Sequence, residues 1–214
     1  MAAQARHRSL TAAILSALVL AGCGASKDEG GISGGGKVIG RTVTVYSLTS
    51  DAGGSGRDFV DAEKLALADA GGRAGALSVN FTSLDLGGPD QEAQAAAARR
   101  AISDPQIIAA IVDATTVTVP LFNAAGILQV ATSGDPALAG DPQALPSGKR
   151  TVGSAPSTPV PADFKTRFRQ EFGHAPAPSA EAGYRAMTGV LKAIGAAGAA
   201  GNDRTHVIDA YFGA

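Results

Sequence analysis

The sequence contains no tryptophan, only three tyrosines and a single cysteine. With Cys23 alone, neither an intrachain disulfide nor a multi-cysteine metal site can form. Because large aromatic side chains are scarce, the core is expected to consist of Ala, Val, Leu and Ile with some Phe. Basic residues are also few: residues 1–22 contain Arg6 and Arg8 and no acidic residue, so their removal lowers the formal net charge from −1 to −3. A basic nucleic-acid-binding face is therefore not expected.

Histidine provides no better basis for a metal site or a catalytic centre. Downstream of the first 22 residues only His174 and His206 remain, without a cysteine partner or a His-x-x-x-His spacing, so neither a metal nor another cofactor is expected. The loop Gly53–Gly56 lacks the Lys-Ser/Thr of a phosphate-binding loop, and Arg57 stands where a nucleophile elbow has its last glycine. Nothing positions a Ser-His-Asp triad. The sequence therefore favours a flexible loop at Gly53–Gly56 and a protein that is not an enzyme.

Residues 1–22 are typical of a signal peptide. Two arginines precede an apolar stretch from Leu10 to Leu20. As a helix this stretch spans about 16 Å, too short for a hydrocarbon core of about 30 Å. The following Leu20-Ala21-Gly22-Cys23 resembles the lipobox of bacterial lipoproteins, which implies that Cys23 is lipidated and that the chain is cut before it. The alternative is an ordinary secretory signal followed by a free cysteine.

Residues 23–37 are expected to form a flexible tether. They are rich in glycine and charged residues and offer too little apolar surface to offset the entropy of ordering. Because two or more lipid chains hold a protein stably on a membrane, we expect export and lipid anchoring through Cys23 at the outer face of the cytoplasmic membrane. Residues 38–214 are enough for one domain with a core of its own.

Strand and helix patterns alternate from residue 41 onward. Short β-branched or apolar runs predict strands, and apolar residues at helical spacing predict helices. The predicted strands cover 41–47, 76–84, 107–112 and 127–131. The predicted helices cover 59–70, 89–102, 116–125, 162–172, 180–197 and a last segment to 210, capped by Asn202 or Asp203. This alternation indicates an α/β fold, a parallel sheet with helices on both faces in three layers.

Ligands of such sheets bind beyond the carboxyl ends of the strands. The loops to consider are therefore residues 48–58, 85–88, 113–116 and 132–136. A second concentration of Pro and Gly, at residues 134–161, marks a loop or junction. Several charged helix residues are expected to face solvent: Asp61, Glu63, Asp69, Arg99 and Arg100.

Three segments in this order resemble the substrate-binding proteins of branched-chain amino acid-type ABC importers, a family of type 1 periplasmic binding proteins. They are Asp61-Ala-Glu-Lys-Leu-Ala-Leu-Ala-Asp-Ala-Gly-Gly72, Asn123-Ala-Ala-Gly-Ile-Leu-Gln-Val130, and Phe164-Lys-Thr-Arg-Phe-Arg-Gln-Glu-Phe-Gly-His-Ala-Pro176 continuing to Ala182-Gly-Tyr-Arg-Ala-Met187. The resemblance implies a periplasmic-binding-protein lobe that binds a small ligand and delivers it to ABC permease subunits. A lipobox in front of the domain fits the same family.

One departure from the family concerns its second lobe. Members have two lobes that close on the ligand, whereas here only a junction near residues 134–161 stands in place of most of the second lobe. It leads directly into the helix that returns to the first lobe in the family. The resemblance therefore implies a shortened, approximately single-lobe protein: the N-terminal lobe is kept and the closing lobe is absent.

The family binds the α-groups of an amino acid with hydroxyls and backbone amides of two loops. By position, the resemblance assigns this role to Thr115 and Thr116, and to Thr132 and Ser133. In place of the family's Ser/Thr-Pro-Ser/Ala pattern the chain reads Ala131-Thr132-Ser133-Gly134. The alternative is that these residues only form turns and helix caps. The acidic partner of the ligand's ammonium group usually comes from the absent lobe.

The function expected from the resemblance is that of an extracytoplasmic, lipid-anchored solute-binding protein of an ABC importer. Its ligand would be an amino acid or a similar small polar metabolite, with binding impaired by the loss of the closing lobe. The alternative is a cell-surface sensor or interaction lipoprotein that retains the lobe as a scaffold and does not take part in transport.

Overall fold

The computed structural model describes residues 36–50 and 55–213. The predicted signal peptide, Cys23 and all of the predicted tether except its last two residues lie outside this part of the chain. None of the described helices has both the length and the apolar composition needed to cross a membrane.

Six strands form one sheet in the order β2-β3-β1-β4-β5-β6. Pairing is parallel throughout except between β2 and β3, which are antiparallel. The strands are β1 (Thr42–Thr49), β2 (Arg73–Ala74), β3 (Leu77–Asp85), β4 (Ile107–Ala114), β5 (Leu128–Gly134) and β6 (Val152–Ser154).

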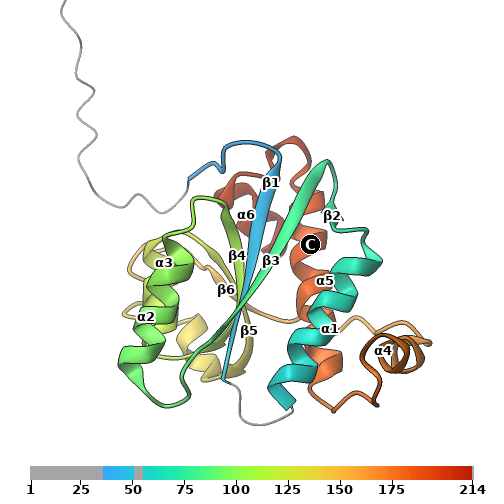
Figure 1. Ribbon diagram of the computed structural model, residues 1–214. Coiled ribbons are helices and arrows are strands. Elements are labelled where there is room, and N and C mark those ends of the chain that lie inside the picture. The colour runs from blue at the N-terminus through green and yellow to red at the C-terminus, as the bar shows by residue number, and fades with distance from the viewer. Residues whose placement is uncertain (1–35, 51–54, 214) are drawn as a thin grey trace, which may run out of the picture. The chain divides into compact units, whose positions relative to one another are not determined.

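Helices cover both faces of the sheet, as Figure 1 shows for α2 and α3 on one side and α1 and α5 on the other. The α-helices are α1 (Ser55–Asp69), α2 (Gln91–Ile102), α3 (Thr118–Ala124), α4 (Phe164–Phe172), α5 (Ala180–Ala196) and α6 (Arg204–Phe212). Two short 3-10 helices are η1 (Pro136–Ala139) and η2 (Gly198–Ala200). The predicted fold class, a sheet between two helical layers, is confirmed.

The two larger hydrophobic cores follow from the alternation of side chains along the central strands. In β1, Val43 and Val45 pack under α1 and α5, whereas Tyr46 and Leu48 pack under α2 and α3. Successive strand residues point to opposite faces, so one apolar strand supplies both cores. β4 is buried along almost its whole length, as expected for a parallel strand covered on both faces.

The Pro- and Gly-rich junction predicted at 134–161 contains two elements that the sequence pattern did not predict. They are η1 and the strand β6, which pairs with β5 in parallel. The two-residue strand β2 was also missed. Its antiparallel pairing with β3 corrects the expectation of a purely parallel sheet. Strands of two or three residues are too short to show a periodic pattern.

The expectation that Asp61, Glu63 and Asp69 face solvent is wrong for Asp61 and Glu63, whereas Asp69 is exposed. Asp61 and Glu63 are buried, and Asp69 binds Arg167 and the Tyr184 hydroxyl. Glu63 is fully buried, and neither of its carboxyl oxygens has a hydrogen-bond partner among the described residues. Burial raises the pKa of Glu63 well above its ordinary value, and the nearby Ser47 hydroxyl and Lys64 charge oppose this only in part.

Candidate functional site

The carboxyl ends of β4 and β5 bring the predicted ligand-binding residues to one edge of the sheet. β4 and β5 are parallel neighbours in which Asp113 pairs with Ser133 and Ala114 with Gly134. A shift in register between Val112 and Asp113 accompanies this pairing. Thr115 and Thr116 directly follow β4, and Thr132 and Ser133 lie near the carboxyl end of β5. The four predicted residues therefore occupy neighbouring positions at this edge of the sheet.

Asp113, which the sequence analysis did not single out, is the centre of the polar contacts at this edge. Its Oδ1 accepts hydrogen bonds from Thr132 Oγ1 at 2.9 Å and Ser133 Oγ at 2.7 Å. Its Oδ2 accepts one from the backbone N–H of Ser50 at 3.0 Å. The signal that could have identified Asp113 is its position, because it is a carboxylate immediately after the apolar run of a buried strand.

Thr115 uses its hydroxyl to organise the turn before α3. The hydroxyl accepts from the backbone N–H groups of Val117 at 3.2 Å and Thr118 at 3.1 Å, and it donates to Gln94 Oε1 at 2.9 Å. The turn-and-cap interpretation therefore describes Thr115 in this structure. Thr116 is exposed, and its hydroxyl makes no hydrogen bond to another described residue.

Glycine is the only residue type that fits position 134, at the end of β5. Its φ is +110°, and a Cβ there would overlap the carbonyl group of Ala114. Without a Cβ, the end of β5 approaches the end of β4 closely enough for Thr132 and Ser133 to reach the Asp113 carboxylate. The departure from the family pattern at Ala131-Thr132-Ser133-Gly134 thus has a structural cause within this chain.

A cavity of about 390 Å³ opens beside Thr132 and Ser133. Arg150 also lines it. The guanidinium carbon of Arg150 lies 4.3 Å from the centre of the Phe212 ring, and Nε donates to the Val152 carbonyl at 3.3 Å. These contacts hold a fixed positive charge at the cavity. The same cavity is thus lined by the cation Arg150, by the acidic residue Asp135 and by two residues whose hydroxyl groups bind Asp113, an arrangement that suits a ligand with both signs of charge.

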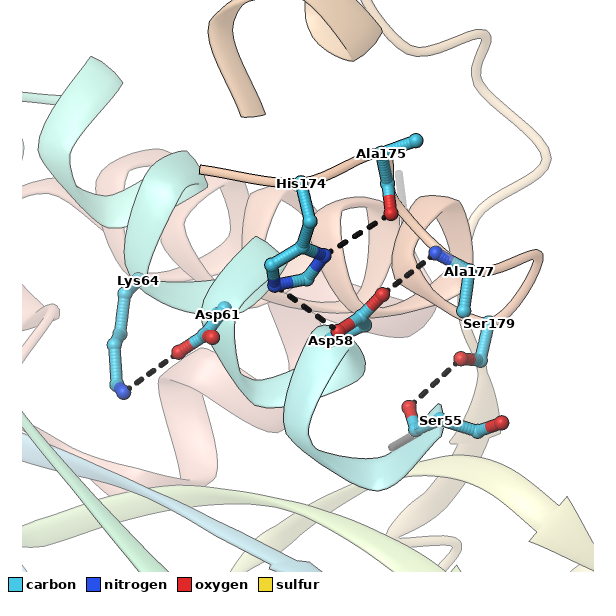
Figure 2. Close-up of polar contacts among 8 residues, drawn as sticks. All are labelled: Ser55, Asp58, Asp61, Lys64, His174, Ala175, Ala177 and Ser179. Atoms are coloured by element: carbon cyan, nitrogen blue, oxygen red, sulfur yellow. Dashed lines mark hydrogen bonds and ion pairs between the residues drawn. The ribbon is translucent and has the colours of Figure 1, made fainter. Parts of the chain in front are cut away.

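A second group of polar contacts ties the start of α1 to the segment between α4 and α5 (Figure 2). Asp58 Oδ2 accepts from the backbone N–H of Ala177 at 2.7 Å, and Ser179 Oγ donates to the Ser55 carbonyl at 2.8 Å. His174 Nε2 lies 3.8 Å from Asp58 Oδ1. No serine hydroxyl in the described part of the chain hydrogen-bonds His174, so these contacts join two elements without assembling a nucleophile and its base.

No group of three or more His, Cys, Asp or Glu side chains within residues 36–50 and 55–213 is arranged to hold a metal ion. Of the glycine-rich loop Gly53–Gly56, only Ser55 and Gly56 lie in the described part, where they begin α1.

Comparison with known proteins identifies a shared fold among solved structures but no match to a family model or a curated sequence. No protein-family model and no curated protein sequence matches the chain. Among solved structures, the chain is similar to a protein described as a branched-chain amino acid ABC transporter from Rhodospirillum rubrum, at a TM-score of 0.60 and 14% identity, covering 79% of this chain and 88% of that one.

Two further structures show the same likeness. A leucine binding protein from Thermotoga maritima matches at a TM-score of 0.57 and 13% identity, over 79% of this chain and 87% of that one. A periplasmic binding protein from Burkholderia mallei matches at 0.55 and 11% identity, over 79% and 82%. The resemblance seen in the sequence is thus confirmed at the level of the fold, and each of these three proteins is described as a transport or binding protein.

Proposed function

We propose that the chain, which has the fold of periplasmic solute-binding proteins, is an extracytoplasmic solute-binding protein of an ABC importer. Its ligand class is amino acids or similar small polar metabolites. The observation that carries the proposal is the Asp113 cluster beside a cavity at the carboxyl ends of β4 and β5, because ligands of parallel sheets bind at this edge. ABC permease subunits in the membrane are the partners of such a protein.

The charges at this edge favour a ligand orientation opposite to the one that the resemblance implied for the Thr and Ser hydroxyls. Thr132 and Ser133 donate their protons to Asp113, so a ligand carboxylate at this point would face a negative charge. A ligand ammonium group fits there instead. Asp135, which lines the cavity, and Asp113, which the Thr132 and Ser133 hydroxyls connect to it, supply the negative charge that the family takes from the other lobe. The ligand carboxylate would then bind Arg150 across the same cavity.

Membrane attachment through Cys23 is part of this proposal. The apolar stretch, the small residues before the cysteine and the glycine-rich segment after it support processing as a lipoprotein. Globomycin treatment of cells that express the full chain, followed by mass spectrometry, tests it. Accumulation of the uncut precursor is expected, whereas a processed chain without acyl groups on Cys23 would contradict the anchor.

Ligand affinity is expected to be low. Between β5 and α4 the described chain forms only η1 and β6, so no second lobe lies there to close over the cavity and exclude water. Ligands bound on one side retain much of their solvent exposure, and the interactions of their charges are weakened accordingly.

Calorimetric titration of the full-length protein in mild detergent tests ligand binding at the site. The probes are leucine, leucine amide, which lacks the carboxylate, and 4-methylpentanoate, which lacks the ammonium group. We expect leucine to bind in the high micromolar to millimolar range, about tenfold or more tighter than either analogue. Asp113→Asn should abolish the preference over 4-methylpentanoate, and Glu171→Gln on the exposed face of α4 is the matched control. Submicromolar leucine affinity would show that the closing lobe is not needed, and equal affinity for all three probes would refute the site.

The second candidate function is a cell-surface sensor or interaction lipoprotein that retains the lobe as a scaffold. It is favoured by the internal hydrogen bonds of Thr115, Thr132 and Ser133, since all three hydroxyls already have partners within the protein. Native mass spectrometry of the protein purified from its own membranes distinguishes the two. A bound small metabolite supports the transport function. If no metabolite is found and leucine gives no heat of binding in calorimetry, the scaffold function is supported.

A further inference from the structure

A larger cavity, of about 440 Å³, lies away from the Asp113 cluster, between the segment that follows β6 and the helices α5 and α6. Its volume falls in the range of small-molecule sites in proteins. The cavity shares only Ser154 with the one beside Thr132 and Ser133, so it offers a separate position for a ligand. Its walls are the segment Ser154–Pro159, one face of α5, and Ala210 with Tyr211 of α6.

The two charged residues that line this cavity are both positive. Arg185 and Lys192 line it, and no Asp or Glu does, although the whole chain has a net charge of −1. The two residues are seven positions apart on α5, two helical turns along one face. Arg185 Nη1 lies 3.4 Å from Glu181 on the same helix, whereas no carboxylate of the described residues lies within ion-pair distance of Lys192.

Hydroxyl groups and apolar surface complete the lining. Thr188, between the two cations, donates its proton to the Tyr184 carbonyl at 2.8 Å, which leaves its oxygen lone pairs available rather than a proton. Ser157 and Thr158, on the opposite wall, are exposed and make no side-chain hydrogen bond within the described chain, so their O–H groups are available as donors. Pro156, Pro159 and Ala193 provide apolar surface.

The position of the wall is set by a glycine. A Cβ at Gly189 would lie 2.7 Å from Pro156 Cγ and 2.8 Å from Pro156 Cδ, closer than real Cβ contacts. Tyr211 fixes the same wall from α6, because its hydroxyl donates to the Ser154 carbonyl at 2.6 Å. Burial raises the pKa of Tyr211 to about 12, so the phenol keeps the proton that it donates.

We propose that this cavity binds a small organic anion: its negative group lies between Arg185 and Lys192 with hydroxyl donors from Ser157 and Thr158, and its apolar body lies against Pro156 and Pro159. The lining holds two cations and no carboxylate, and only Arg185 has an acidic neighbour, Glu181, so the cavity favours an anion over a zwitterion. The site is independent of the amino acid site at Asp113, where a carboxylate is the central group.

Titration of the full-length, isotope-labelled protein in detergent micelles tests the proposal by NMR. The probes are benzoate, inorganic phosphate and benzamide, which is the neutral analogue of benzoate. Benzoate should shift the amide signals of Thr188 and Gly189 saturably, and both phosphate and benzamide should bind at least tenfold more weakly. Saturation by benzamide at the same concentration, or phosphate affinity equal to that of benzoate, would overturn the organic-anion assignment, as would no saturation by benzoate.

Variants locate the binding. The double variant R185Q/K192Q should weaken benzoate binding at least tenfold, and Gly189→Ala should weaken it by displacing Pro156. Arg99→Gln on α2 removes an exposed cation elsewhere and should leave binding unchanged. Benzoate affinity that is unaffected by R185Q/K192Q would refute the site. The comparison of benzoate with benzamide on the unmodified protein decides the question even if the variants fold poorly.

Discussion

β1 passes two carboxyl groups whose surroundings differ sharply. Glu63 of α1 points into the apolar core near Ser47 of β1. It is fully buried, and neither of its carboxyl oxygens is hydrogen-bonded. At the end of β1, the backbone N–H of Ser50 is one of three donors to Asp113, which remains partly open to solvent. Of the two acidic groups close to β1, Glu63 therefore has no hydrogen-bond partner, whereas Asp113 has three donors.

The difference shows what each region requires of a carboxyl group. An unpaired charge in an apolar core is costly, so burial raises the pKa of Glu63 and favours its protonated form. Asp113 instead accepts three hydrogen bonds and remains partly open to water. The core therefore holds an acidic group without partners at a cost in stability, and the edge holds one with three donors beside a cavity.

The largest effect is expected where the core is tightest. Gly183 of α5 packs against α1, and a Cβ at that position would overlap the Phe59 carbonyl. Gly183→Ala should lower the free energy of unfolding by about 3 kcal/mol, measured by urea denaturation. Gly195→Ala on the same helix is the control, since its Cβ would meet nothing closer than 3.7 Å. That variant should be neutral or stabilising by up to about 1 kcal/mol, and equal losses for the two would contradict the close packing.

Replacement of the unpaired acid should stabilise the protein. Glu63→Leu is expected to raise the free energy of unfolding by about 2 kcal/mol at neutral pH, because a polar group without partners leaves the core. Glu63→Gln, which keeps a polar group, should give a smaller gain. Urea denaturation of the three proteins measures both effects, and a destabilised Glu63→Leu would show that the carboxyl group makes a contact worth keeping.

The pH dependence of stability tests the same group. The pKa of Glu63 is higher in the folded protein than its ordinary value of 4.5, so the folded state binds this proton more tightly than the unfolded state. The resulting contribution is complete below pH 4.5 and is lost as the pH rises toward the folded pKa. Both Glu63 variants should lack this decline in stability, whereas an unchanged pH profile would mean that other groups cause it.

At the edge, the effect on stability should be smaller. Asp113→Ala removes an acceptor of three hydrogen bonds, but the freed donors are close to solvent and can bind water. A loss of about 1 kcal/mol is expected, by urea denaturation, with Ser133→Ala smaller still. A loss as large as that of Gly183→Ala would make Asp113 a structural residue and would weaken its assignment to the ligand.

The smallest effect is expected at a partly exposed ion pair. Arg167 of α4 binds Asp69 of α1, which also accepts a hydrogen bond from Tyr184. Arg167→Gln should lower the free energy of unfolding by about 0.5 kcal/mol, and 1 M salt should reduce the difference. A salt-independent loss of several kcal/mol would show that this pair is shielded from solvent like the core.

Much of the fold could be predicted from local patterns. The predicted strands and helices all exist, and Asp203, one of two predicted caps, caps α6 through hydrogen bonds from the N–H groups of Thr205 and His206. Although burial opposes the change, the hydrogen bonds from His206 and Thr205 and the His206 charge lower the pKa of Asp203. Helix periodicity and caps are local in sequence, so a single sequence carries them.

It was harder to predict which side chains become buried where separate strands and helices pack together. Glu63 follows Phe59 by four residues and precedes Ala66 by three, so its position on the buried face was present in the spacing. Its charge suggested solvent instead. The edge residues Thr115, Thr132 and Ser133 were found by position, but their partners Gln94 and Asp113 depend on how separate strands and helices meet.

The start of the described chain is held at the opposite end of the sheet from Asp113. The backbone N–H of Val38 donates to the Asn202 carbonyl at 2.7 Å, Asn202 Nδ2 donates to the Val38 carbonyl at 2.8 Å, and Lys37 forms a β-bridge with Asp203. The eight residues of β1, at about 3.3 Å each, then carry the chain roughly 26 Å to the carboxyl edge. The chain therefore joins the sheet at its amino end, and the Asp113 cluster lies at the far end of the same strand, where the segment around Lys37 does not cover it.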